Sequence, residues 1–225
     1  MAQTDSIVAL IPAYNADRFV GDVVRRASAH LPVIVVNDGS TDRTLAEATA
    51  AGARVIDQQP NQGKGVALKR GFQAAFDRGV AAVITLDADG QHDPSEIPLF
   101  VERFRTTGAD LIIGERDFSK MPLVRRVSNT VGRLAFSWAM GRRIRDNQSG
   151  YRLLSTRLMQ AVLASEERGY EFEMDMIVIA VKRGWRIEGV PIRTIYGEET
   201  SHIKPMQHVV QFFRMVRQAR RAMRG

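Results

Sequence analysis

Short apolar runs alternate with amphipathic stretches through the first half of the chain. Five apolar runs lie at residues 6–11, 32–36, 53–56, 81–86 and 109–114, and polar residues follow each of them. Between these runs, apolar residues recur at helical spacing. The alternation predicts parallel strands joined by helices, with ligands bound where the strands end.

The same patterns extend over the whole chain. Predicted helices span residues 17–30, about 40–51, 66–78, 93 onward, 122–140, 156–164 and 172–183. Ser40 or Thr41 is expected to cap the second of these helices. Further strands are predicted at 151–154 and 185–191, and a loop at 195–204. We therefore expect an α/β fold of three layers around a mostly parallel central sheet.

The run at 81–86 ends in a group of polar side chains. Asp87 and Asp89 occupy alternate positions, and Gln91 lies two residues further on. In an extended segment, alternate residues project to the same side, so both carboxylates can face one point beyond the strand. Such oxygen ligands suit a hard divalent cation that also binds a diphosphate. The alternative is an ordinary solvated turn.

Composition narrows the class of protein. The 225 residues are 44% hydrophobic and include no cysteine, so the chain can bury a full core but has no disulfide or thiolate chemistry. Its net charge of +7 favours anionic partners. Because the sequence shows no leader-like segment and no apolar run of membrane-spanning length, we expect a cytoplasmic protein, either soluble or peripheral.

Basic residues concentrate in the second half of the chain. Residues 205–225 contain five arginines and no acidic residue, and their apolar residues recur at helical spacing. This pattern predicts a basic amphipathic helix that lies on an anionic membrane or docks on the sheet. We expect a catalytic domain at 1–204, with 205–225 as part of it or as a membrane contact.

Five polar motifs occur in a characteristic order. They are Pro12-Ala13-Tyr14-Asn15, Asn37-Asp38-Gly39-Ser40-Thr41-Asp42, Asn61-Gln62-Gly63-Lys64-Gly65, Asp87-Ala88-Asp89-Gly90-Gln91-His92 and Ser149-Gly150-Tyr151-Arg152. Together they resemble the family 2 glycosyltransferases with the GT-A fold, and within them the dolichyl-phosphate mannose synthase-like branch. The resemblance covers most of residues 6–200. It implies an inverting transfer of a hexose from a nucleotide-diphosphate sugar of the GDP-mannose or UDP-glucose type.

The resemblance also implies a donor site. The nucleotide sugar is expected to contact Pro12, Tyr14, Asn15, Asp38, Lys64, Asp87, Ala88 and Asp89. Tyr14 offers a face for the base, Asp38 accepts ring or ribose protons, and Lys64 reaches a phosphate. Asp87, Asp89 and Gln91 resemble the metal ligands of the family, for Mg²⁺ or Mn²⁺. The alternatives are an ordinary loop aromatic for Tyr14 and a structural glycine turn around Lys64.

The acceptor decides which residues carry the chemistry. A polyprenyl phosphate is already anionic near neutral pH, so it needs basic residues to position it more than it needs a base. By resemblance these residues are Arg116 and Arg152, with Ser201 and Lys204 from a loop that closes near the donor phosphates. Arg133, from a second group of basic residues at 125–145, is a further candidate for the acceptor phosphate. A saccharide hydroxyl of a cell-envelope polysaccharide is the alternative acceptor, and it would require a base. The predicted catalytic residues are Asp89, Arg116, Arg152 and the candidate bases Glu173 and Asp146.

Several partners follow from this interpretation. We expect a nucleotide-sugar donor, a polyprenyl-phosphate acceptor and an anionic membrane surface on the inner face of the cytoplasmic membrane. A separate membrane-spanning protein is a further candidate partner. Nucleic acid is not expected, because no recognition helix or aromatic platform accompanies the basic residues. A homologue that binds nucleotide without turnover is disfavoured by the intact Asp87 and Asp89.

Overall fold

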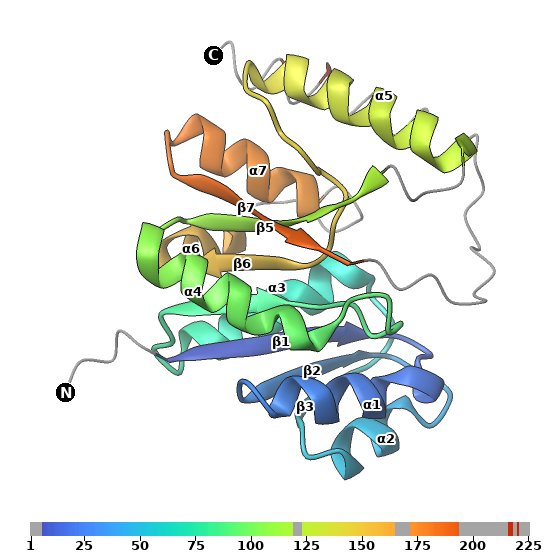
Figure 1. The fold of residues 1–225 in the computed structure, drawn as a ribbon. Coiled ribbons are helices and arrows are strands. Elements are labelled where there is room, and N and C mark those ends of the chain that lie inside the picture. Colours follow the sequence, from blue (N-terminus) through green and yellow to red (C-terminus); the bar gives the residue numbers. More distant parts are fainter. Residues whose placement is uncertain (1–5, 119–122, 165–171, 194–215, 218–219, 221–225) are drawn as a thin grey trace.

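The computed structural model describes residues 6–118, 123–164, 172–193, 216–217 and 220. Within these residues a seven-stranded sheet has the order β3-β2-β1-β4-β6-β5-β7. The strands are β1 (Ile7–Ala13), β2 (Val33–Asp38), β3 (Arg54–Gln58), β4 (Ala82–Thr85), β5 (Leu111–Arg116), β6 (Arg152–Ser155) and β7 (Ile187–Ile192). Only β6 runs against its neighbours among them, antiparallel to both β4 and β5. The expected α/β fold with a mostly parallel sheet is confirmed (Figure 1).

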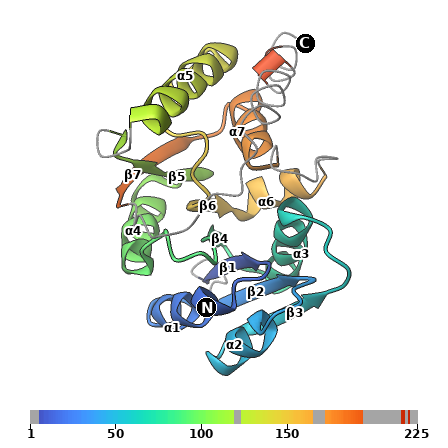
Figure 2. The ribbon, with the colours of Figure 1, turned by 90° about the vertical axis from the view of Figure 1, so that its right-hand side faces the viewer.

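Helices cover both faces of this sheet (Figure 2). One face carries α1 (Asp17–Ser28), α2 (Thr44–Ala50) and α4 (Ile97–Thr107), and the other carries α3 (Lys64–Phe76), α6 (Thr156–Leu163) and α7 (Phe172–Lys182). A further helix, α5 (Leu123–Met140), lies beyond the sheet, at the end where β5 and β7 are the outermost strands. The three predicted layers are therefore present.

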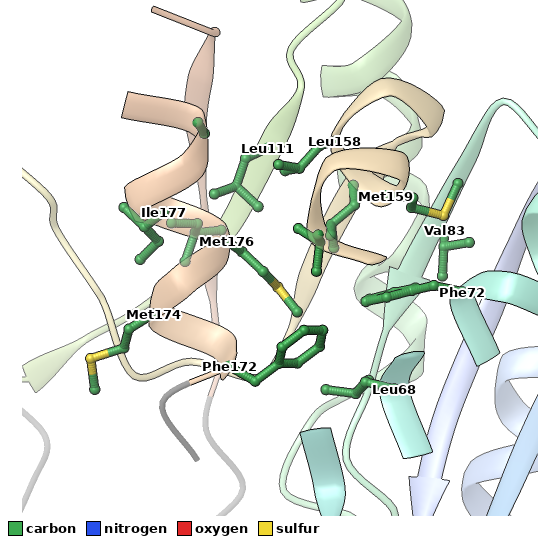
Figure 3. Packing of buried hydrophobic residues seen from close by; sticks show 14 of the residues in the cluster. Leu68, Phe72, Val83, Leu111, Leu158, Met159, Phe172, Met174, Met176 and Ile177 are labelled. Atoms are coloured by element: carbon green, nitrogen blue, oxygen red, sulfur yellow. The ribbon is translucent and has the colours of Figure 1, made fainter. Parts of the chain in front are cut away.

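The apolar residues form one cluster on each face. The cluster under α3, α6 and α7 contains Phe72 and Phe172, whose ring centroids are 6.2 Å apart (Figure 3). The cluster under α1 and α4 contains Tyr151 stacked on Phe100 at 4.4 Å. Since both faces are filled by side chains, polar chemistry is confined to the edge where the strands end.

The start of α2 differs from the expectation. Neither Ser40 nor Thr41 caps it, because the helix begins only at Thr44. Asp42 instead accepts a hydrogen bond from the Thr44 amide at 2.9 Å. The Ser40 hydroxyl accepts from the Asn15 amide at 3.0 Å, and the Thr41 amide donates to the Asn15 side chain at 2.9 Å. These residues tie the loop after β2 to the loop after β1.

The basic segment at 205–225 and the predicted loop before it are described only in part. The expected loop at 195–204, with Ser201 and Lys204, lies outside the described residues, as does most of 205–225. Val216 is buried in the cluster that includes α5, and the Arg220 guanidinium lies 4.5 Å from the Trp138 ring centroid. The division at residue 204 stays a prediction. Of the described helices, none is both long and apolar enough to cross a membrane.

Candidate active site

The predicted donor residues gather where β1, β2 and β4 end. Leu10 of β1 lies opposite Thr85 of β4, so Tyr14 and Asp87 follow their strands at the same edge. The Tyr14 side chain is 54% exposed, which leaves its ring face free for a ligand. The neighbouring Pro12 and Ala88 are buried.

Asp38 shapes the loop that leads to Lys64. Its carboxylate accepts hydrogen bonds from the Gln58 side chain, from the Gln62 amide at 2.9 Å and from the Gly63 amide at 2.8 Å. The carboxylate is buried, so these bonds hold the loop firmly. Asp38 thereby sets the start of α3 at Lys64. Its predicted contact with a base or ribose stays a prediction.

The acidic turn after β4 is held by its own hydrogen bonds. The Gln91 amide donates to Asp89 at 2.9 Å, and the Asp87 amide donates to Nδ1 of the buried His92 at 3.1 Å. Burial lowers the pKa of His92, which keeps Nδ1 available as an acceptor. His92 therefore stabilises the turn through this hydrogen bond, which indicates a structural residue rather than a ligand.

Lys64 lies between two carboxylates. Its ammonium is 2.5 Å from Asp87 and 2.8 Å from Glu173 at the start of α7. Burial opposes the charge of Lys64, but Asp87 and Glu173 raise its pKa above the ordinary value. Burial would likewise raise the pKa of Asp87, yet Lys64 and then His92 lower it to about 2. Lys64 and Asp87 are therefore both ionised at neutral pH.

Gly150 makes room for the Asp87 carboxylate. A Cβ atom on Gly150 would lie 2.7 Å from an Asp87 carboxylate oxygen. The approach is close because β6 pairs with β4, and the Thr85 hydroxyl donates to the Gly150 carbonyl at 2.7 Å. The motif at residues 149–152 thus packs against the acidic turn, and its glycine serves a steric purpose.

Arg116 and Asp146 form a two-pronged ion pair. Nε and Nη2 of Arg116 lie 2.7 and 2.9 Å from the two carboxylate oxygens of Asp146. Asp146 is 1% exposed and also accepts from the Gln148 and Ser149 amides. Arg116 and Arg133 both lie over the ring of Phe118, at 5.8 and 5.5 Å from its centroid. Two of the predicted acceptor-binding arginines therefore meet at Phe118.

Arg152 lies behind the site. It is 1% exposed, and its guanidinium donates to the carbonyls of Ser149, Asn147 and Glu173. Burial lowers the pKa of Arg152, while the carboxylates of Glu173 and Asp146 work against that effect. The structure thus ties Arg152 to the backbone around both candidate bases. Its predicted contact with the acceptor stays a prediction.

The donor set fits a hard divalent cation. Asp87 and Asp89 offer carboxylate oxygens, and the Lys64 ammonium beside Asp87 shows that a cation is favoured there. Among the described residues, no three acidic, histidine or cysteine side chains converge on one point. The protein would therefore supply only part of the coordination sphere, and diphosphate oxygens and water would complete it.

Three neighbours of the site were not predicted from the sequence as site residues. Phe118 receives both arginines, Gly150 clears space for Asp87, and Gln58 fixes Asp38. Of these only Gly150 carries a sequence signal, since it lies inside a recognised motif. A surface hollow of about 420 Å³ lies nearby, between β5, β7 and the segment after α5, and Asp146 and Arg143 are part of its lining.

The chain is similar in sequence to several known proteins. The family model described as glycosyl transferase family 2 matches residues 8–163. An uncharacterised protein of Methanocaldococcus jannaschii is 33% identical over 86% of this chain and 83% of its own length. A UDP-N-acetylglucosamine–dolichyl-phosphate N-acetylglucosaminyltransferase of Methanococcus voltae is 30% identical over 85% of this chain and 86% of its own length. An undecaprenyl-phosphate mannosyltransferase of Micrococcus luteus is 31% identical over 85% of this chain and 84% of its own length.

Solved structures show the same fold. Glucosyl-3-phosphoglycerate synthase from Mycobacterium tuberculosis in complex with UDP superposes with a TM-score of 0.77 and 21% identity, over 96% of this chain and 80% of that chain. The same enzyme in complex with Mn²⁺, UDP and glucosyl-3-phosphoglycerate superposes with a TM-score of 0.74 and 22% identity, over 96% of this chain and 78% of that chain. The expected GT-A fold is confirmed.

Proposed function

Because the chain belongs to glycosyl transferase family 2, in its dolichyl-phosphate mannose synthase-like branch, we propose that it transfers a hexose to a polyprenyl phosphate. The donor is a nucleotide-diphosphate sugar of the GDP-mannose or UDP-glucose type, and the transfer inverts the anomeric centre. Relatives named for dolichyl and undecaprenyl phosphate support this acceptor class. The two substrates meet at a membrane, so we place the enzyme peripherally on the inner face of the cytoplasmic membrane.

The observation that carries this proposal is that both candidate bases are occupied. Asp146 is held by Arg116 through both oxygens, and Glu173 is paired with Lys64 at 2.8 Å. Each carboxylate is thus already engaged by a cation and is not free to face an acceptor hydroxyl. A saccharide hydroxyl would have to lose its proton to such a group, whereas a phosphate oxygen attacks as an anion. The geometry thus favours the phosphate acceptor.

On the acceptor side, Arg116 and Arg133 bind the phosphate beside Phe118. An arginine fork matches phosphate oxygens, and Asp146 orients that of Arg116. Arg152 acts through the backbone at residues 147–149 and at Glu173, because its guanidinium is already engaged there. Ser201 and Lys204 remain proposed phosphate contacts from outside the described residues.

On the donor side, Asp87 and Asp89, with Gln91, would hold Mg²⁺ or Mn²⁺. A bound cation would supply positive charge opposite the charge that develops on the leaving nucleoside diphosphate. Lys64 adds a second positive charge at the start of α3, a position that favours phosphate. Tyr14, exposed at the end of β1, receives the base. Donor and acceptor sites therefore border each other along the strand ends.

The test is transfer of labelled sugar from a panel of GDP- and UDP-sugars into an organic-extractable product. Purified protein is incubated with polyprenyl phosphate and Mn²⁺ or Mg²⁺, with Asp89→Ala as the control. We expect labelled lipid that depends on metal and is lost in the control. If saccharides are labelled and lipid is not, the acceptor proposed here is wrong.

Asp146→Asn and Glu173→Gln then separate the two acceptor classes. If either carboxylate is a base, its variant loses turnover even at saturating acceptor, by about 10²- to 10⁴-fold. If Asp146 instead positions Arg116 and Glu173 positions Lys64, each variant should mainly raise a KM: that of the acceptor for Asp146→Asn and that of the donor for Glu173→Gln. A collapse of kcat with unchanged KM would favour the saccharide mechanism.

A further inference from the structure

The hollow of about 420 Å³ lies at the edge of the sheet, between β5, the outermost strand β7 and the segment that follows α5. In Figure 1 this segment runs back from α5 past β5 to β6. Sites for small organic molecules have volumes of about 300–1,000 Å³. Neither Arg116 nor Arg133 belongs to the lining. The hollow is therefore large enough for an organic ligand and is separate from the proposed acceptor site.

The charges that line this hollow do not balance. Its three carboxylates are each paired with arginine: Glu115 with Arg145 at 3.1 Å, Glu188 with Arg186 and Arg103 at 2.9 and 3.7 Å, and Asp146 with Arg116 at 2.7 Å. Arg142 and Arg143 also line it, and neither forms an ion pair within the part of the chain that the structure describes. Arg142 donates instead to the Ile187 carbonyl at 3.2 Å. Two positive charges therefore remain unmatched at one place.

The turn that carries these two arginines has a fixed backbone. Gly141 follows the end of α5 with a φ of 62°, a conformation that favours glycine. The Ser137 hydroxyl donates to the Ile144 carbonyl at 3.1 Å and accepts from the Ile144 amide at 3.0 Å. The turn at 141–144 is thus tied to α5 at both ends. A cationic site on a fixed backbone loses less conformational entropy when an anion binds.

The chemistry of the lining defines the class of ligand. Ile113 and Ile144 are each 3% exposed and form an apolar part of the lining, which suits the organic body of a small molecule. Arginine forks bind phosphate oxygens in pairs. A phosphate monoester carries a charge of about −2 near neutral pH, so it matches two unpaired arginines. The diester of a membrane phospholipid carries one charge and would leave one arginine unmatched.

We infer that this hollow is a second anion site, which binds a soluble organic phosphate monoester. The phosphate lies between Arg142 and Arg143, and the organic body lies against Ile113 and Ile144. The site is additional to the donor and acceptor sites and does not depend on the proposed function.

Asp146 connects this hollow with the proposed acceptor site. Its carboxylate borders the hollow and binds Arg116 through both oxygens. A dianion in the hollow adds negative charge beside Asp146 and opposes the binding of a second phosphate at Arg116. We therefore expect the ligand to raise the acceptor KM without lowering kcat. This consequence alone rests on the proposed function.

Binding of phenyl phosphate tests the site without sugar donor or lipid. This probe is a soluble monoester with an apolar ring, and calorimetric titration with EDTA at about pH 7.5 keeps it a dianion and removes metal ions from the acidic turn. Arg142→Gln with Arg143→Gln is compared with Arg54→Gln with Arg78→Gln, which removes the same charge at exposed positions on β3 and after α3. We expect the first pair to raise the Kd by at least ~10-fold and the control pair to bind like the wild type.

Further comparisons decide where and how the probe binds. If Arg116→Gln with Arg133→Gln abolishes binding and the pair at 142 and 143 does not, the probe binds at the acceptor site and the inference is overturned. Unchanged binding by all pairs overturns it as well. Methyl phenyl phosphate, a diester, should bind at least ~10-fold more weakly than the monoester. Equal binding of the diester would assign the hollow to a phospholipid headgroup instead.

Transfer kinetics separate this inference from the proposed function. With polyprenyl phosphate in detergent, phenyl phosphate should raise the acceptor KM to a plateau, and the pair at 142 and 143 should remove this effect. A KM that rises without limit would mean direct competition at Arg116 and would contradict the coupling. If the wild type binds phenyl phosphate through the hollow but transfers no sugar, the proposed function fails and the site stands. If transfer succeeds and binding ignores residues 142 and 143, the site fails alone.

Discussion

At the scale of single residues, Lys64 has the most exacting position. Its ammonium lies 2.5 Å from Asp87 and 2.8 Å from Glu173, so it occupies a place where positive charge is required. In Lys64→Met both carboxylates lose this partner. We expect kcat/KM for transfer to fall by about 10²-fold, because a charge beside the leaving diphosphate is lost. Mn²⁺ binding without nucleotide, followed by electron paramagnetic resonance, should become tighter because the ammonium no longer competes for Asp87.

A matched control for this variant lies on the same helix. The Lys69 ammonium lies 5.3 Å from the centroid of the Phe172 ring. Lys69→Met should therefore leave both transfer and Mn²⁺ affinity close to the wild type. If Lys64→Met behaves like Lys69→Met, the ammonium is a structural charge and takes no part in donor or metal binding.

Glu96 provides a pH-dependent prediction away from the metal ligands. One carboxylate oxygen accepts from the Arg193 amide at 2.9 Å, and the other is buried without a partner among the described residues. Burial raises the pKa of Glu96. The folded state therefore holds this proton more tightly than the unfolded state does. The stability that this group contributes is present below its unfolded pKa and is lost as the pH rises through its folded pKa.

Glu96→Gln should remove this loss. Relative to the wild type, the free energy of unfolding of the variant should increase as the pH rises from about 4 to about 7. Urea denaturation at a series of pH values measures this difference. Glu102→Gln, at an exposed position on α4, should leave the pH dependence unchanged. A difference that stays flat with pH for Glu96→Gln would contradict the buried-carboxylate explanation.

Neighbouring functional side chains could be predicted from the sequence where a single local motif contains them both. Asp87 and Asp89 are separated by one residue directly after an apolar run, so the sequence alone indicates a paired carboxylate site. The ion pairs could not be predicted, because Glu173 lies on a helix far along the chain from Lys64. The same holds for Asp146, which the sequence offered as a base and the structure pairs with Arg116. Which carboxylate is occupied depends on tertiary packing rather than on local pattern.

At the scale of elements, hydrophobic periodicity was sufficient to predict type but not direction. The apolar run near 151–154 was expected as a strand, and β6 is present at Arg152–Ser155. Its antiparallel pairing with β4 and β5 depends on how the chain returns after α5, which no local pattern encodes. The predicted cap of α2 was wrong for a related reason. Ser40 and Thr41 form hydrogen bonds with Asn15, which belongs to another loop.

The contact of α3 with β1 gives a prediction at this scale. A Cβ atom on Gly71 would lie 2.2 Å from a methyl carbon of Leu10, which is fully buried. Gly71→Ala must push α3 away from β1, so we expect a loss of about 1–3 kcal/mol in the free energy of unfolding. Gly21→Ala on α1 is the matched control, since its nearest neighbour is the flexible end of Arg25 at 3.3 Å.

The control should move in the opposite direction. Alanine is a better helix former than glycine, so Gly21→Ala is expected to stabilise the protein by about 0.5–1 kcal/mol. Urea unfolding of both variants measures the two changes side by side. Equal effects of the two substitutions would mean that helix propensity, not the close approach of α3 to β1, decides the outcome at Gly71.

At the scale of the whole molecule, the charged residues form two basic regions, at 120–145 and 205–225, and one acidic turn after β4. In the proposed function, the acidic turn needs a cation before it can accept a diphosphate, while the net charge of +7 favours anionic partners. Arg116 and Arg133 join the end of β5 to α5, because both lie over the ring of Phe118. In the proposed function, the acceptor phosphate therefore binds where β5 ends beside α5.

Ligand binding should be visible in the stability of the whole chain. A nucleoside diphosphate at about 100 times its Kd stabilises the folded state by about 2.7 kcal/mol. For a chain of this length, that corresponds to a rise in Tm of about 5–10 °C. We expect UDP or GDP to produce this rise in a thermal unfolding scan when Mn²⁺ is present, and to lose it when a chelator is added.

Two variants make the result specific to the acidic turn. Asp89→Ala should abolish the shift with Mn²⁺, and Asp89→Asn, which can still accept from the Gln91 amide, serves in case the alanine variant unfolds. Stabilisation by nucleotide that persists in chelator would mean that Lys64 and the loop after β2 bind the diphosphate without a metal. In that outcome Asp87 would serve mainly to hold Lys64, and the metal dependence proposed for transfer would be wrong.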